Sequence, residues 1–310
     1  MAINKAMRIA LKALSYPDLD IKKNYKLKRQ LNTVVNPYLR PRYTIWDHKI
    51  AGIDYEIPVR IFLPPDSSEV ELNRVLIFFH GGGWVTGNID SYSNVCTNMA
   101  SQTGAIIVSV DYRLAPEYRF PCALNDCYSV TREIFLDSTL FDVDTDNIIL
   151  IGDSAGANLA AAVSMMARDK GEFRVSKQIL IYPSTNNDHS DETGFNSIRE
   201  FGREYLLTSK RIRDYMDLYI STEIDLQNPY MAPLIAKDLS SQPETLIITA
   251  EYDPLRDEGE AYGKKLKQHG NLVEVYRMKN ALHGFFSLPK NFVHVKQSYE
   301  LINRFLRSKL

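Results

Sequence analysis

Residues 148–159 read Ile-Ile-Leu-Ile-Gly-Asp-Ser-Ala-Gly-Ala-Asn-Leu. An apolar run typical of a buried strand enters a G-x-S-x-G motif at 152–156, and a helical pattern continues from Ala157 to about Lys170. A serine on such a strand-to-helix turn is held in a strained conformation with its hydroxyl above the sheet. The alternative is a glycine-rich turn that carries a serine by chance. The flanking strand and helix favour Ser154 as a nucleophile.

The rest of the chain alternates in the same way. Continuous apolar runs predict strands at 74–80, 105–111, 147–151, 178–182, 245–250 and 272–277. Helical patterns are predicted at 90–103, 121–136, 155–170, 258–269 and 295–310. Fully apolar strands alternating with helices indicate an α/β protein with a mostly parallel sheet covered on both faces. Two earlier runs, 43–50 and 55–64, predict an antiparallel start.

Composition limits the class of protein. The 310 residues are 45% apolar and 24% charged, with a net charge of −1, so the molecule as a whole offers no electrostatic basis for binding nucleic acid. The three cysteines predict reduced thiols rather than disulfides, and no pattern predicts a metal site. With no signal-peptide pattern and no apolar run that could span a bilayer, we expect a cytoplasmic protein. The oligomeric state stays open, a homodimer included.

Charge is unevenly distributed along the chain. Residues 1–42 carry a net charge of +8, and an amphipathic helix is predicted near their start, with Ile3, Met7 and Leu11 on one face. Such a helix could lie on a membrane surface. Because its apolar face lacks Trp or Phe anchors, we expect it to pack over the rest of the protein instead.

A polar stretch and then a helical one, at 184–225, interrupt the alternation. A helix is expected over 204–220, with Thr208 or Ser209 as N-cap of its later part. An insertion after a strand of such a sheet lies where these folds bind ligands. We therefore divide the chain into an N-terminal cap segment (1–42), a core (43–183 and 226–310) and a cap insertion (184–225).

A nucleophilic serine needs a base and a group that orients the base. Of the six histidines, His283 is the one that follows a strand on the same side of the sheet as Ser154. His189 is set aside because it lies in the insertion, where we expect it to be poorly fixed. The acid should follow a strand between Ser154 and His283. Asp253 meets this condition, whereas Asp257 and Glu258 fit the first turn of the next helix.

An oxyanion needs preorganised N–H donors. His80-Gly81-Gly82-Gly83-Trp84 follows the apolar strand at 74–79. Consecutive glycines let backbone amides turn toward a substrate without a Cβ clash. The predicted donors are the N–H groups of Gly82, Gly83 and Ala155.

With these residues in place, the chain resembles the hormone-sensitive lipase-like family of α/β-hydrolase esterases. The resemblance rests on five segments in family order, covering about residue 45 to the end: HGGGW at 80–84, DYRLAPE at 111–117, GDSAG at 152–156, DPLRDEG at 253–259 and HGF at 283–285. It implies an α/β-hydrolase fold, a cap built from an N-terminal segment plus an insertion, and a structural role for 111–117. Ala157 departs from the family, which often has a second glycine there.

The combined prediction is a serine carboxylesterase for small-molecule esters with short to medium acyl chains, with no cofactor. Amide, thioester or lactone hydrolysis remains an alternative, because the pocket and not the triad chooses the leaving group. A non-catalytic ligand receptor on the same fold is a second alternative, although here all three triad residues are present. A lipase docked on lipid by the basic helix is a third. Side chains expected in the pocket are Trp84, Tyr182, Tyr205, Leu206 and Phe285.

Overall fold

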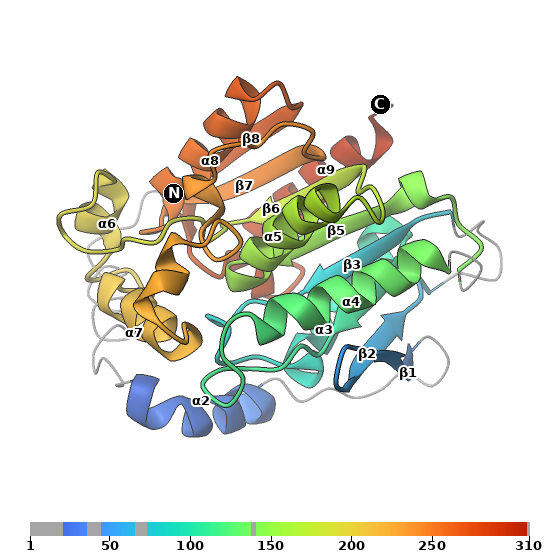
Figure 1. Ribbon diagram of the computed structural model, residues 1–310, viewed down its shortest axis with the longest axis horizontal. Coiled ribbons are helices and arrows are strands. Elements are labelled where there is room, and N and C mark those ends of the chain that lie inside the picture. Colours follow the sequence, from blue (N-terminus) through green and yellow to red (C-terminus); the bar gives the residue numbers. More distant parts are fainter. Residues whose placement is uncertain (1–20, 36–44, 66–72, 138–140, 309–310) are drawn as a thin grey trace.

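A computed structural model describes residues 21–35, 45–65, 73–137 and 141–308, and in these residues the strands form one eight-stranded sheet (Figure 1). The strands are β1 (Ile45–Ala51), β2 (Glu56–Phe62), β3 (Val75–Phe79), β4 (Ile106–Val110), β5 (Ile148–Asp153), β6 (Lys177–Ile181), β7 (Glu244–Tyr252) and β8 (Val273–Leu282). Their spatial order is β1-β2-β4-β3-β5-β6-β7-β8. β2 pairs antiparallel with β1 and β4, and β3 to β8 pair in parallel. The predicted α/β class and antiparallel start are confirmed.

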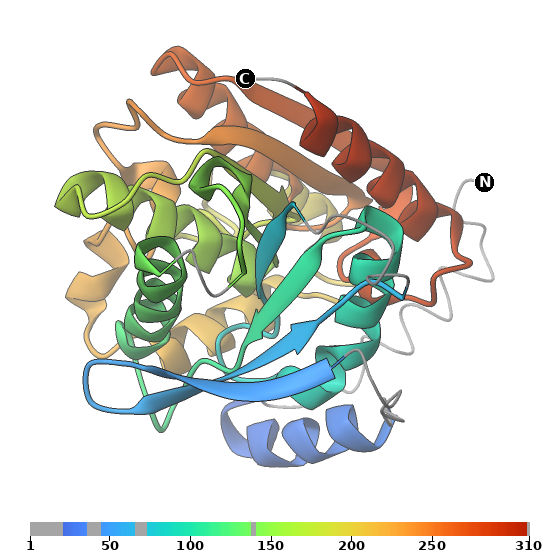
Figure 2. The same ribbon diagram turned by 90° about the vertical axis from the view of Figure 1, so that its right-hand side faces the viewer.

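Helices cover both faces of the sheet (Figures 1 and 2). The α-helices are α2 (Ile21–Val35), α3 (Ile89–Thr103), α4 (Cys122–Leu136), α5 (Ala155–Lys170), α6 (Asn196–Phe201), α7 (Ser209–Tyr219), α8 (Arg256–Gln268) and α9 (Val293–Arg307). Short 3-10 turns lie at η2 (Thr145–Asn147), η3 (Glu223–Gln227), η4 (Pro233–Ile235) and η5 (Phe285–Ser287). α3 and α9 pack on one face, and α4, α5 and α8 pack on the other.

The middle of the sheet is buried throughout. Every residue of β3, β4, β5 and β6 is buried, so alternate side chains enter two separate cores. Ile77 lies in the core of α4, α5 and α8, and Phe78 lies in the core of α3 and α9. Because parallel strands end at a common edge, the loops after β3, β5, β7 and β8 are brought together there.

Helix α7, which follows α6 in the insertion, is shorter than the helix predicted from the sequence. Residues 204–220 were expected to be helical, but α7 begins at Ser209 and α6 ends at Phe201. Leu206 between them has φ of +66°, a conformation outside the helical region. Thr208 is the N-cap, as expected, because its side chain accepts the N–H of Arg211 at 3.1 Å.

α2 packs mainly against α7 and also contacts α3 (Figure 1). Lys22 Nζ donates to Asp217 Oδ2 at 2.6 Å, and Arg29 donates to the carbonyl oxygens of Val85 and Ala115 at 2.7 and 2.8 Å. The amphipathic helix predicted near Ile3 to Leu11 lies outside the described residues. Within the described ranges, no helix is both long enough and apolar enough to cross a bilayer.

Candidate active site

Ser154 lies on a sharp turn between β5 and α5. Its φ of +54° belongs to a region that a side-chain-bearing residue adopts only under strain. The turn is tight: a Cβ at Gly152 would lie 2.3 Å from the Gly156 carbonyl oxygen, and one at Gly156 would lie 1.9 Å from that of Phe79. Glycine at 152 and at 156 is thus required by the neighbouring backbone.

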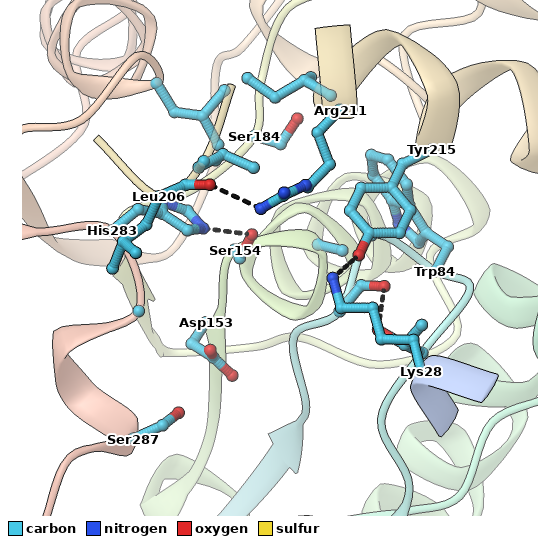
Figure 3. A pocket seen from close by; sticks show the side chains of 18 of the residues that line it. Lys28, Trp84, Asp153, Ser154, Ser184, Leu206, Arg211, Tyr215, His283 and Ser287 are labelled. Atoms are coloured by element: carbon cyan, nitrogen blue, oxygen red, sulfur yellow. Dashed lines mark hydrogen bonds between the residues drawn. The ribbon is translucent and has the colours of Figure 1, made fainter. Parts of the chain in front are cut away.

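The structure brings Ser154 together with the histidine and the aspartate predicted from the sequence, and Figure 3 shows the contact between His283 and Ser154. His283 Nε2 lies 2.9 Å from Ser154 Oγ, and His283 Nδ1 lies 2.8 Å from Asp253 Oδ2. Asp253 is fully buried, and its other oxygen accepts the N–H of Leu255 at 2.9 Å. The Asp253 carboxylate therefore accepts a hydrogen bond from the Nδ1–H of His283, which leaves Nε2 free to accept the serine proton.

The two nearest alternative acids are engaged elsewhere. Asp257 Oδ2 accepts the N–H of Ser197 at 2.8 Å, and Glu251 Oε2 accepts the N–H of Asn280 at 2.6 Å. The Nδ1 of His283 faces Asp253 instead of either of these carboxylates.

Glu258 joins the insertion to the core. Its Oε1 accepts the N–H groups of Thr185 and Asn186 at 2.6 and 3.1 Å, and its Oε2 lies 2.8 Å from His189 Nε2. Both side chains of the Glu258–His189 pair are fully buried. The expectation that His189 is poorly fixed was therefore wrong, because the insertion folds back onto the first turn of α8.

The loop after β3 carries the candidate oxyanion donors. Gly82 and Gly83 have φ of +126° and +62°. A Cβ at Gly82 would lie 2.0 Å from the Thr86 carbonyl oxygen, and one at Gly83 would lie 2.4 Å from the Tyr215 ring. Ala155 is the first residue of α5, where backbone N–H groups have no partner within the helix. All three predicted donors line the same cavity as Ser154.

His80, the first residue of this loop, is held in place by Tyr112. Its ring is fully buried and stacks on Tyr112 at 4.3 Å between ring centroids, and the Tyr112 hydroxyl donates to the His80 carbonyl at 2.6 Å. Burial lowers the pKa of His80 to about 4, so the ring is neutral at physiological pH. His80 is thus a structural anchor of the oxyanion loop rather than a second base.

Asp153 supports the loop from the nucleophile side, a role that sequence reasoning missed. Its Oδ1 accepts the N–H of Gly81 at 2.8 Å, and its Oδ2 accepts the hydroxyls of Tyr92 and Tyr182 at 3.1 and 3.3 Å. Burial raises the pKa of Asp153 to about 6. The variable position of the G-x-S-x-G motif gave no signal of this contact with a loop 72 residues away.

This pKa shift predicts a pH-dependent term in stability. Asp153 keeps its proton longer in the folded chain, so its stabilising contribution is complete below pH 3.8 and is lost as the pH rises through about 6. Relative to Asp153→Asn, the wild type should therefore lose up to about 3 kcal/mol of unfolding free energy across this window. Urea unfolding of both proteins from pH 4 to 8 measures the difference. A constant difference would contradict the prediction.

A cavity of about 290 Å³ opens above Ser154 (Figure 3). Trp84 and Leu206, both predicted for the pocket, line it. Further walls come from α2, from the insertion at 184–225 and from neighbouring loops: Lys28, Leu207, Arg211, Ile212, Tyr215, Leu255 and Ser287. Of these residues, Leu255 alone lies within one of the quoted sequence motifs, at 253–259. In the described part of the chain, no group of three His, Cys, Asp or Glu side chains could hold a metal ion.

The other three predicted pocket residues do not line this cavity. Tyr182 is buried, its ring 4.7 Å from that of His283, so it supports the histidine from behind. Phe285 packs edge-on against Tyr182 at 5.2 Å. Tyr205 stacks on Tyr252 at 5.7 Å.

Known proteins are similar to this chain in sequence and in fold. A family model described as alpha/beta hydrolase fold matches residues 76–287. The arylesterase of Saccharolobus solfataricus is 37% identical over 245 residues, covering 79% of this chain and 78% of that protein. Carboxylesterase NlhH of Mycobacterium tuberculosis is 35% identical over 264 residues, covering 83% and 79%. A hyperthermophilic esterase from Pyrobaculum calidifontis superposes with a TM-score of 0.85 at 33% identity, over 99% of this chain and 98% of the other.

The family match covers more than half of the chain, and the curated relatives match over most of their own length. The sequence motifs, the strand order and these similarities agree with one another. The chain therefore belongs to the hormone-sensitive lipase-like family of α/β-hydrolase esterases.

Proposed function

We propose that this esterase hydrolyses carboxylic esters with short to medium acyl chains through a covalent acyl-enzyme. The observation that carries the proposal is the continuous contact from Asp253 through His283 to Ser154, at 2.8 and 2.9 Å. Such a contact lets one side chain act as nucleophile, the next as base and the third as the group that orients the base.

In the first half of the reaction, Ser154 Oγ attacks the ester carbonyl and His283 Nε2 takes its proton. The negative charge that develops on the carbonyl oxygen is stabilised by the N–H groups of Gly82, Gly83 and Ala155. Asp253 stabilises the imidazolium that forms. His283 then gives its proton to the leaving alkoxide, and the alcohol departs.

In the second half, water attacks the acyl-enzyme along the same route. His283 takes a proton from the water, the tetrahedral oxyanion forms again in the same hole, and collapse returns the proton to Ser154 Oγ. The products are a carboxylic acid and the free enzyme. Every proton is moved by His283, so no cofactor is needed in this scheme.

The proposed chain-length preference rests on the size of the cavity. The cavity volume of about 290 Å³ lies just below the range of roughly 300–1,000 Å³ that is typical of ligand pockets. We assign α2 and the insertion at 184–225 to a cap, because Lys28, Leu206, Leu207 and Tyr215 form walls above Ser154. Such walls confine an acyl chain to a short length.

Hydrolysis of 4-nitrophenyl esters from acetate to palmitate tests this proposal. We expect kcat/KM to peak at short to medium chains, because longer chains exceed the cavity and must displace the cap. The Ser154→Ala variant gives the background rate. A maximum at palmitate would overturn the chain-length assignment, and no release from any ester would overturn the esterase assignment for these substrates.

A further inference from the structure

Two cationic side chains line the cavity. Lys28 from α2 and Arg211 from α7 extend into the space around Ser154 (Figure 3). Among the described residues that line this cavity, the one carboxylate is Asp153, which is buried with its oxygens bound by Gly81 and two tyrosine hydroxyls. A cleft walled by one sign of charge attracts ligands of the opposite sign.

The environment of Lys28 differs from that of the neighbouring cations on α2. Lys22 pairs with Asp217 at 2.6 Å, and Arg29 Nη2 pairs with Glu117 at 3.0 Å. Lys28 instead donates to the hydroxyl of Tyr215, a neutral group. Over the part of the chain that the structure describes, no carboxylate lies within ion-pair distance of Lys28. Among the described residues, its charge therefore faces the cavity without a counterion.

Tyr215 fixes the position of this charge relative to the oxyanion loop. The Lys28 ammonium lies 5.1 Å from the centroid of the Tyr215 ring. The same ring lies against Gly83, whose added Cβ would be 2.4 Å from it. One aromatic ring thus separates the ammonium from a candidate oxyanion donor. A substrate group on a short spacer from the reacting carbonyl can span this separation.

We propose that Lys28 binds a carboxylate on the substrate, so that the enzyme prefers esters carrying a negative charge near the scissile bond. The inference rests on the proposed ester hydrolysis and adds the substrate class. The charge can lie on the acyl side, as in the half-ester of a dicarboxylic acid, or on the alcohol side. Arg211, which donates to the Leu206 carbonyl at 2.6 Å, adds positive charge to the same cavity.

Two matched ester pairs test the two sides. For the acyl side, mono-4-nitrophenyl adipate is compared with neutral 4-nitrophenyl hexanoate. For the alcohol side, 4-acetoxybenzoate is compared with neutral 4-acetylphenyl acetate. The ratio of kcat/KM between charged and neutral ester is measured for the wild type and for Lys28→Met, after subtraction of uncatalysed release.

The Lys28→Met variant should lower this ratio about tenfold for at least one pair, the lower range expected for a hydrogen bond to a charged group in a half-exposed site. The loss should appear mainly in KM, because the contact exists before and during the reaction. Lys28→Arg should restore most of the ratio. Lys26→Met is the matched control, because Lys26 is an exposed lysine of α2 that does not line the cavity.

An unchanged ratio in Lys28→Met for both pairs, or an equal change in Lys26→Met, would overturn the inference while ester hydrolysis itself stands. A separate measurement does not depend on turnover. Calorimetry can measure how tightly mono-4-nitrophenyl adipate and 4-acetoxybenzoate bind to the inactive Ser154→Ala variant. At least one of the two esters should bind more weakly to the double variant Ser154→Ala/Lys28→Met than to Ser154→Ala. Equal binding of both esters would count against the lysine even if the proposed function failed.

Discussion

Replacement of Ser154 by alanine should reduce kcat for 4-nitrophenyl esters by about 10⁶-fold, the loss seen when a triad nucleophile is removed. The remaining groups cannot compensate, because His283 Nε2 faces Ser154 Oγ at 2.9 Å and the removed hydroxyl leaves no atom to form the acyl bond. Oxyanion donors and pocket contacts alone should leave a small residual rate above that in water. Steady-state kinetics against an enzyme-free blank measures the loss.

The fold should survive this change. Alanine has the same Cβ as serine and meets the same backbone strain at φ of +54°, so the thermal midpoint should stay close to that of the wild type. Circular dichroism melting provides this control. Turnover retained by a variant purified free of wild-type enzyme would mean that another side chain is the nucleophile.

Replacement of Asp253 by asparagine should reduce kcat by about 10⁴-fold, as expected when the histidine tautomer is reversed. The Leu255 N–H donates to Asp253 Oδ1 at 2.9 Å, so the asparagine oxygen keeps that place and its NH₂ faces His283. His283 Nδ1 must then accept, and the ring proton moves to Nε2. In that tautomer Nε2 cannot take the proton of Ser154. The pH dependence of kcat for both proteins measures the effect.

Asp257→Asn is the matched control for this change. Asp257 has the same chemistry but binds the N–H of Ser197 instead of His283, so its replacement should cost far less turnover than Asp253→Asn. If Asp257→Asn instead lowered kcat as strongly, or if Asp253→Asn turned over at a near-normal rate, the orienting acid would be a different carboxylate.

Local sequence was sufficient for much of the site. Gly152 and Gly156 are required by backbone within a few residues and by one neighbouring strand, so the turn at Ser154 could be read from the G-x-S-x-G pattern. His283 and Asp253 follow strands of a parallel sheet, and such strands end at one edge. Their meeting with Ser154 over 129 and 99 residues of chain therefore followed from topology rather than from any local contact.

The residues that line the cavity could not be predicted from the sequence in the same way. Lys28 reaches Ser154's cavity because α2 packs on α7, a contact between segments 187 residues apart with no periodic pattern to predict it. Tyr205 is aromatic and adjacent to Leu206, yet the left-handed backbone at Leu206 turns one side chain into the cavity and leaves the other on Tyr252. Residue type alone did not distinguish the two.

The two tryptophans of the chain lie in different environments, so each can report on a different part of the molecule by its fluorescence. Trp84 is buried and stacks on Tyr219, the last residue of α7, at 4.6 Å, whereas Trp46 on β1 is half exposed. The chain has no other tryptophan. Fluorescence from Trp46 reports solvent at the edge of the sheet and can be quenched by iodide. Because Trp84 stacks on the last residue of α7, its emission should shift when α7 separates from the oxyanion loop, and this shift would be distinct from the iodide quenching of Trp46.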